Sequence, residues 1–221
     1  MDPEKLRFGL IYIVALVLSI CVHEFGHAFV ADKLGDRLPR SQGRVTLNPL
    51  AHIDPIGTLL LPLIAIFSGP AIGSRILGWG KPVQISLSPR DMTRKISIRT
   101  AHALIAMAGP AMNILFGLLL SGILLGMIKS GHLQFAQPVA AVIQMNISLC
   151  LFNLLPIPPL DGGAVLRRIM PRRFEPQLDQ LDKFGFIILF ALLMTGALSW
   201  LMWPATVVAQ FWLEHLIHWA T

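Results

Sequence analysis

The sequence carries a metal-binding pattern in its first apolar segment. His23 and His27 are four residues apart, and Glu24 directly follows the first histidine, in the order His-Glu-x-x-His. Side chains four residues apart share one face of a helix, so the two imidazoles can hold one metal ion. Glu24 then lies where its carboxylate can take a proton from a water bound to that metal. The pattern predicts metal-assisted hydrolysis with Glu24 as the general base.

The surroundings of this pattern are those of a membrane helix. Residues 8–31 are predominantly apolar, and the ionisable groups among them that would strain a helix in lipid are His23, Glu24 and His27. Charged groups are costly inside a bilayer, so those that occur there usually mark a functional site. The alternative is a soluble helix whose histidines are only hydrogen-bonded in a core. The cost of burial favours the metal site.

The composition of the whole chain supports a membrane protein. Apolar residues make up 54% of the 221 residues and charged residues only 14%, against roughly 25% in soluble domains. The net charge of +6 fits basic loops at an anionic membrane surface. No nucleic-acid partner is expected, because the chain has one tyrosine and no basic–aromatic motif. Cys21 and Cys150 lie in apolar runs and are expected to be small buried side chains.

Apolar runs of about 20 residues, the length that crosses a bilayer, divide the chain. We predict three core helices at residues 8–31, 103–128 and 135–155. Residues 56–74 form a further apolar segment, which Pro62 and a Gly-Pro pair make either a short span or a re-entrant element. Residues 184–213 are too long for one upright span and are expected to break at Pro204.

Two shorter segments, residues 43–49 and 83–87, have the composition of short strands. The predicted fold is an α-helical polytopic membrane protein with about four to six transmembrane helices. It has a three-helix catalytic core and short strand or re-entrant elements. Residues 1–221 are expected to form a single integral membrane domain.

A catalytic zinc site needs a further ligand, because such sites combine about three protein ligands with an open position for water. Candidates near the ends of apolar segments are His52, Asp54, His102 and Asp161. Asp161 is favoured, because a proline-rich stretch links it to the end of an apolar helix and can carry it back towards the membrane. It is expected to end an extended loop on a flexible Gly-Gly. The alternative is a residue of an ordinary Asp-Gly turn, which needs no preceding prolines.

Two motifs in this order resemble the site-2 protease family of intramembrane zinc metalloproteases. They are His23-Glu24-Phe25-Gly26-His27 and, further on, Asn153-Leu154-Leu155-Pro156 with Leu160-Asp161-Gly162-Gly163. Residues 109–113 are similar to that family's middle core helix. The chain looks like a compact bacterial-type member, without the inserted PDZ domain or the nucleotide-sensing domain of larger ones.

The resemblance implies roles for individual residues. One zinc ion would be bound by His23, His27 and Asp161, with Glu24 as the general base. Asn153 would contact the substrate or the transition state, although a helix C-terminal cap explains it equally well. His52 lies in a stretch, residues 48–55, that resembles compact bacterial members. It would either support the metal ligands or lie at the membrane interface, and the interfacial position is favoured.

The implied activity is that of an intramembrane zinc endopeptidase, which cleaves transmembrane protein substrates within the lipid bilayer. A non-catalytic zinc-binding membrane protein or a metal transporter is the main alternative. A transporter is expected to show more intramembrane ionisable groups or paired broken helices, which the sequence lacks. A zinc protease of another family would use a glutamate as its third ligand. Glu175 and Glu214 are the downstream glutamates, and neither lies in a metal-binding helical motif.

The distribution of Lys and Arg predicts the orientation. If residues 56–74 cause no net crossing, both metal motifs open to one face, which then holds 15 of the 18 basic residues. If residues 56–74 cross the membrane fully, the more basic face holds only 13 of the 18 basic residues. Basic loops stay in the cytoplasm, so the stronger bias favours the first arrangement. We therefore predict a multi-pass protein of the bacterial inner membrane whose zinc site opens to the cytoplasm.

Overall fold

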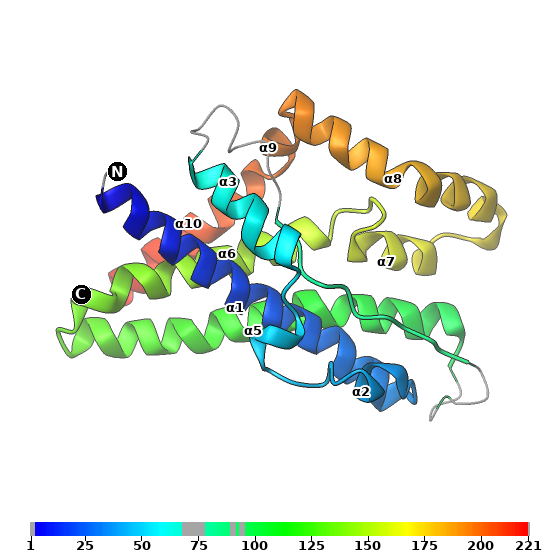
Figure 1. Ribbon diagram of the computed structural model, residues 1–221, viewed down its shortest axis with the longest axis horizontal. Helices are drawn as coiled ribbons and strands as arrows, with labels where there is room; N and C mark the ends of the chain where they lie inside the picture. The colour runs from blue at the N-terminus through cyan, green and yellow to red at the C-terminus, as the bar shows by residue number, and fades with distance from the viewer. Residues whose placement is uncertain (1–2, 68–77, 89–91, 93–95, 221) are drawn as a thin grey trace.

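Three long helices form the centre of the molecule. The computed structural model describes residues 3–67, 78–88, 92 and 96–220. Helices α1 (Pro3–Leu34), α5 (Ile98–Lys129) and α6 (Ala136–Asn153) pack against one another (Figure 1). Within the described ranges, three helical stretches are long and apolar enough to cross a membrane, namely Leu6–Leu34, Ile98–Lys129 and Leu133–Asn153. They match the three predicted core segments, the third of which ends two residues earlier than predicted, and this confirms the α-helical membrane fold.

Helices α1 and α5 run antiparallel. Ser19 lies opposite Asn113, and His27 lies opposite Ile105. The end of α1 packs on the start of α5, in a cluster formed by Ala31, Leu34, Ala101 and Ile105. The chain between the two helices therefore returns to the end of α1 from which it departed, as the predicted absence of a net crossing requires.

Short helices and an extended segment fill this connection. They are α2 (Leu38–Ser41), η1 (Pro49–Ala51), the π-helix η2 (Pro55–Leu60) and α3 (Leu61–Phe67). Helix α3 reaches the N-terminal part of α1, because a Cβ built at Gly9 would lie 2.9 Å from Cγ2 of Ile66. The chain then passes Leu16 at Gly78 and Ile20 at Gly80, travelling back along α1. Residues 68–74 of the predicted apolar segment lie outside the described residues.

The two predicted strands are not observed, since no strand occurs in the part of the chain that the structure describes. Residues 83–87 are extended but do not pair with a second strand. Two of their backbone donors are used by carboxylates instead: Val83 N–H bonds to Glu24 (3.1 Å) and Ser86 N–H to Asp36 (2.6 Å). The carboxylates of Glu24, in α1, and Asp36, just after α1, therefore accept the hydrogen bonds that a neighbouring strand would have accepted.

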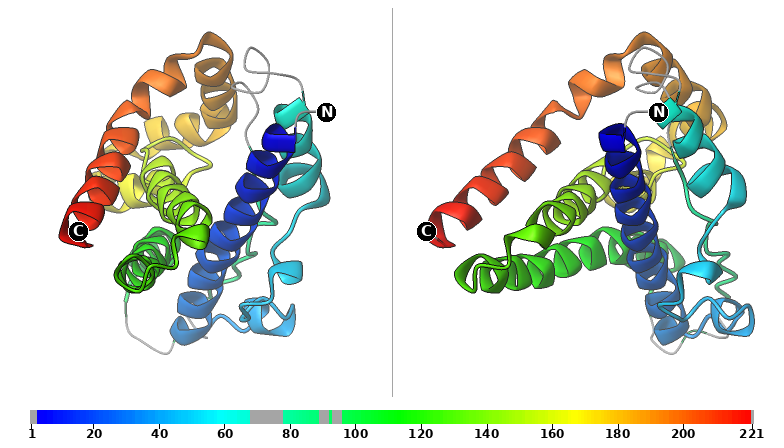
Figure 2. Two further views of the ribbon diagram at one scale, coloured as in Figure 1. Left: turned by 90° about the vertical axis from the view of Figure 1, so that its left-hand side faces the viewer. Right: turned by 60° about the vertical axis from the view of Figure 1, so that its left-hand side comes forward.

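The C-terminal third is helical and folds back onto the core. It comprises α7 (Asp161–Ile169), η4 (Arg172–Phe174), α8 (Glu175–Thr195), α9 (Ala197–Leu201) and α10 (Trp203–Ala220), and η3 (Leu133–Phe135) precedes α6. Helix α10 lies beside α6 (Figure 2), where Ala209 joins a buried cluster with Leu124 and Ile143. The indole of Trp212 donates to Ser121 Oγ at 2.9 Å. This contact ties α10 to α5.

The predicted break of this region at Pro204 is confirmed, because α9 ends at Leu201 and α10 begins at Trp203, directly before the proline. The first interruption is at Gly196, whose φ of 78° is left-handed and ends α8. Glycine adopts this conformation without the clash of a Cβ. Pro204 lies in the first turn of α10, where a missing N–H costs no helical hydrogen bond.

Candidate metal centre

Three ligand atoms converge between α1 and the start of α7. His23 Nε2 and His27 Nε2 are 3.0 Å apart, and Asp161 Oδ2 lies 3.2 Å from the first and 3.4 Å from the second. Both histidines are buried, with exposures of 5% and 7%. The structure thus brings together the three predicted metal ligands, although Asp161 is more than a hundred residues from the two histidines in the sequence.

The hydrogen bonds of the two imidazoles define their tautomers. His23 Nδ1 lies 2.6 Å from Asn113 Oδ1, and His27 Nδ1 lies 2.7 Å from the carbonyl oxygen of Ile105. The amide nitrogen of Asn113 donates hydrogen bonds to Ser19 O and Asn146 Oδ1, and these bonds fix the orientation of the amide. Both partners are oxygen acceptors, so each Nδ1 carries the proton and each Nε2 presents a lone pair. Ligating histidines are commonly oriented in this way.

The converging atoms suit a cation. Within the described residues, Asp161 Oδ2 is buried and has no hydrogen-bond donor, although it lies beside two imidazole nitrogens. Three lone-pair atoms at such spacings repel one another unless a positive charge lies between them. Tetrahedral zinc, with bonds of about 2.0–2.1 Å to nitrogen and oxygen, places neighbouring ligand atoms about 3.3 Å apart. The donor set and the spacing therefore fit zinc.

Close backbone packing makes room for this arrangement. A Cβ built at Gly109 of α5 would overlap the His27 imidazole and lie 2.6 Å from Cε1 of His23. A Cβ at Gly162 would overlap the carbonyl oxygens of Leu154 and Leu155. The prediction of a flexible Gly-Gly after Asp161 is wrong, because both glycines lie buried in the first turn of α7. Their small size allows the turn to pack against the loop that follows α6, at Leu154, Leu155 and Pro158.

Helix α7, which begins with Asp161, is fixed at its other end by ion pairs. Arg167 bonds to Glu175 (2.9 Å), Asp179 (3.0 Å) and Asp182 (2.5 Å), all on α8. Arg99 of α5 donates to the carbonyl oxygens of Arg167 and Met170. These contacts connect α7 to two neighbouring helices and stabilise the position of its first residue.

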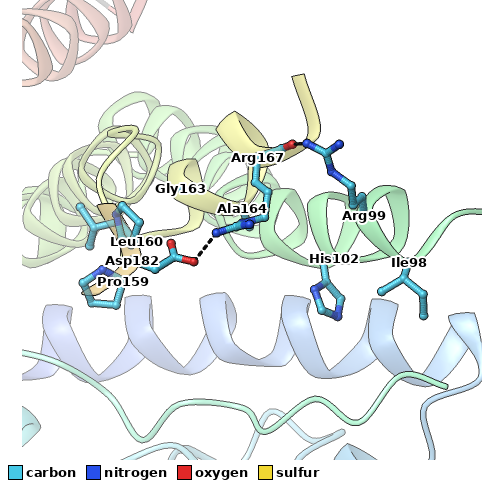
Figure 3. A pocket seen from close by; sticks show the side chains of 10 residues that line it. Ile98, Arg99, His102, Pro159, Leu160, Gly163, Ala164, Arg167 and Asp182 are labelled. Atoms are coloured by element: carbon cyan, nitrogen blue, oxygen red, sulfur yellow. Dashed lines mark hydrogen bonds and ion pairs between the residues drawn. The ribbon is translucent and has the colours of Figure 1, made fainter. Parts of the chain in front are cut away.

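A pocket of about 290 Å³ lies beside α7 (Figure 3). Leu160 and Gly163, on either side of Asp161 in the chain, line it, together with Ile98, Arg99, His102, Pro158, Pro159, Ala164, Arg167 and Asp182. His102 points from α5 towards α1, whereas Arg99 points towards α7. The pocket does not contain the three converging ligands but borders the turn that carries one of them.

The remaining candidate ligands have other positions. Asp54 caps η2 by accepting from Ile56 N and Gly57 N, and His102 is exposed. His52 is 1% exposed, with Nε2 2.8 Å from Thr46 O, so it is buried within the protein, and its position at the membrane interface stays a prediction. Burial lowers the pKa of its imidazole. Within the described part of the chain, these residues form no metal-binding group.

Glu24 and Asn153, the two other predicted site residues, are not among the three converging ligands. Glu24 is next to His23 on α1, and its side chain is 13% exposed. Asn153 is the last residue of α6, and its amide donates back to Leu149 O at 3.0 Å. This bond belongs to the helix end, so a contact of Asn153 with the substrate stays a prediction.

Asn113, Asn146 and Ser19 were not predicted as site residues. Asn146 joins Asn113 to Ser19, with its own amide 2.9 Å from Ser19 Oγ, and all three are fully buried. The signal in the sequence was an amide in each of two apolar helices. Such groups are costly in a membrane unless they are hydrogen-bonded.

Comparison with known proteins agrees with this centre. The family model of "Peptidase family M50" matches residues 125–196. The chain is 35% identical over 199 residues to "Putative zinc metalloprotease YwhC" of Bacillus subtilis, covering 87% of this chain and 84% of the relative. It is 32% identical over 191 residues to "Putative zinc metalloprotease Rip2" of Mycolicibacterium smegmatis, covering 86% and 69%. No solved structure matches the chain. The extent of these similarities shows that the chain belongs to peptidase family M50, the site-2 protease family of zinc metalloproteases.

Proposed function

We propose that this protein is an intramembrane zinc endopeptidase, which hydrolyses peptide bonds in or near the transmembrane segments of other proteins. The observation that carries the proposal is the convergence of His23 Nε2, His27 Nε2 and Asp161 Oδ2 against α1, a helix long and apolar enough to cross a bilayer. Apolar helices hold this centre, so its substrates are expected to reach it from the lipid.

The proposed chemistry divides among few residues. His23, His27 and Asp161 hold one zinc ion, which when bound supplies a Lewis acid that activates water and polarises the scissile carbonyl. Glu24 accepts the proton of the attacking water and delivers it to the leaving amine as the carbon–nitrogen bond breaks. Asn153 is proposed to contact the substrate or the transition state. The peptide bond becomes one carboxylate and one amine.

The substrate must expose a carbonyl before it can react. In a transmembrane helix every backbone carbonyl is bonded within the helix, so the segment has to unwind locally. Helix-breaking residues make unwinding easier. Transmembrane proteins with such residues are the proposed partners, and no nucleic acid is involved.

The proposal is tested with the full chain reconstituted in lipid vesicles together with a panel of single-span peptides. Cleavage within or beside the apolar segment of a peptide is expected. The cleavage activity should be lost when a chelator removes zinc and should return when zinc is added. A zinc-loaded protein that cleaves no member of the panel would favour the non-catalytic alternative.

We further propose that the protein lies in the bacterial inner membrane with its zinc site opening to the cytoplasm. The antiparallel packing of α1 and α5 supports this orientation, because it brings Arg37 and Arg40, just after the end of α1, to the same end of the core as Arg99 in the first turn of α5. Reporter cysteines at Ser41 and Ser97 are both expected to be shielded from an impermeant reagent in intact cells. A cysteine at Ser130, an exposed residue at the other end of α5, is the control expected to react. Labelling of either position 41 or 97 from outside would contradict the orientation.

A further inference from the structure

Arg44 is a cation buried beside the proposed general base. It is 3% exposed, and its Nη2 lies 3.9 Å from Glu24 Oε2. Burying a guanidinium is costly without a counter-charge, and the Glu24 carboxylate supplies one. A separation of 3.9 Å is too long for a direct hydrogen bond. Arg44 therefore has no direct hydrogen bond to Glu24, and its hydrogen bonds go to backbone carbonyl oxygens beside Glu24.

The guanidinium of Arg44 joins two segments that cover Glu24. Its Nη1 donates to the carbonyl oxygen of Ala51, and its Nη2 donates to that of Lys81. Lys81 N–H in turn bonds to His52 O at 2.9 Å. One side chain thus anchors the start of the extended segment to the loop that contains η1.

The anchored segment contacts Glu24 two residues later. Val83 N–H donates to Glu24 Oε2 at 3.1 Å. Gly80 allows this close approach, because a Cβ there would overlap Ile20 of α1 and lie 3.7 Å from Cγ of Glu24. In the part of the chain that is described, the hydrogen bond to Glu24 uses Oε2, so Oε1 stays available for a proton.

We propose that Arg44 is a positioning residue for Glu24. By anchoring the backbone at Lys81, it holds the Val83 N–H against one oxygen of the Glu24 carboxylate, which orients the other oxygen towards the attacking water. The inference rests on the proposed role of Glu24 as the base. Residues that orient a group at a metal site typically change activity by about 10–100-fold when they are replaced.

The test compares Arg44→Met and Arg44→Lys with Arg40→Met in the full chain in lipid vesicles. Arg40 is a matched control, because it lies in the same connection but its side chain is 66% exposed and pairs with Asp32. Val83→Pro removes the one N–H and leaves Arg44 in place. Three properties are measured: zinc content, kcat and KM on a single-span peptide, and hydrogen exchange of the backbone amides of Lys81 and Val83.

For Arg44→Met we expect zinc to be retained, kcat to fall about 10–100-fold, and KM to change less than about two-fold. Exchange at the Lys81 and Val83 amides should accelerate about ten-fold or more, since the anchor is lost. Arg44→Lys, or guanidinium added to Arg44→Met, should restore part of kcat. Val83→Pro should lower kcat in the same way, and Arg40→Met should match the wild type.

Unchanged exchange or unchanged kcat in Arg44→Met would overturn the inference while leaving the proposed protease intact. Loss of zinc together with kcat would also overturn it, because Arg44 would then be needed for folding rather than for orienting the base. If exchange accelerates but even the wild type cleaves nothing, the anchoring stands and the proposed function fails.

Discussion

Glu24→Gln is expected to abolish proteolysis while the protein keeps its zinc. Glutamine has the shape of glutamate, and its amide oxygen can still accept the hydrogen bond from Val83 N–H. It cannot accept the proton of the attacking water, and general base catalysis of this kind typically contributes about 10²–10⁴-fold. The loss is measured as kcat on a single-span peptide, with the zinc content of the same preparation determined in parallel.

The matched control is Glu214→Gln, the same substitution at an exposed residue of α10. Its kcat should equal that of the wild type. Cleavage by Glu24→Gln at a rate close to the wild type would show that another group takes the proton. A fall in zinc content would instead show that Glu24 is needed for the metal centre to form.

Gly109→Ala is expected to remove both zinc and activity through a single added methyl group. The new Cβ would overlap the His27 imidazole and crowd His23. The two ligands cannot move aside freely, because their Nδ1 atoms are bonded to Ile105 O and Asn113 Oδ1. Metal affinity therefore falls, and kcat falls with it.

Gly122→Ala and Gly126→Ala are the matched controls on the same helix. A Cβ at either position meets nothing within 4 Å. Alanine is favoured over glycine in a helix interior by roughly 0.5–1 kcal/mol, so these variants should be as stable as the wild type or slightly more stable. Wild-type zinc content in Gly109→Ala would mean that α1 and α5 are farther apart than the structure shows.

The features that depend on short sequence spacing could be predicted. The His-Glu-x-x-His pattern fixes the two histidines on one face, because it needs only the period of one helix. The three long helices follow from hydropathy for a similar reason. The position of Asp161 beside the histidines was reached through the proline-rich stretch and the family resemblance, and the structure places its carboxylate there.

Features that depend on long-range packing could not be predicted. Asn113 reaches His23 across 90 residues of sequence, and Val83 reaches Glu24 across 59. Residues 83–87 have the composition of a strand, but a carboxylate took the place of a pairing strand. Gly162 and Gly163 suggested flexibility, whereas they let the first turn of α7 pack against the loop that follows α6. For Asn113 and for residues 83–87, the partner that determines the structure is distant in the sequence.

The most direct test of the metal centre is the zinc content of the purified full chain beside that of Asp161→Ala. We expect about one zinc per chain in the wild type and a large loss in Asp161→Ala, because the third of about three protein ligands is removed. His102→Ala, which changes another candidate ligand that lies outside the converging group, should keep wild-type zinc. Wild-type zinc in Asp161→Ala, or its loss in His102→Ala, would contradict the centre built from His23, His27 and Asp161.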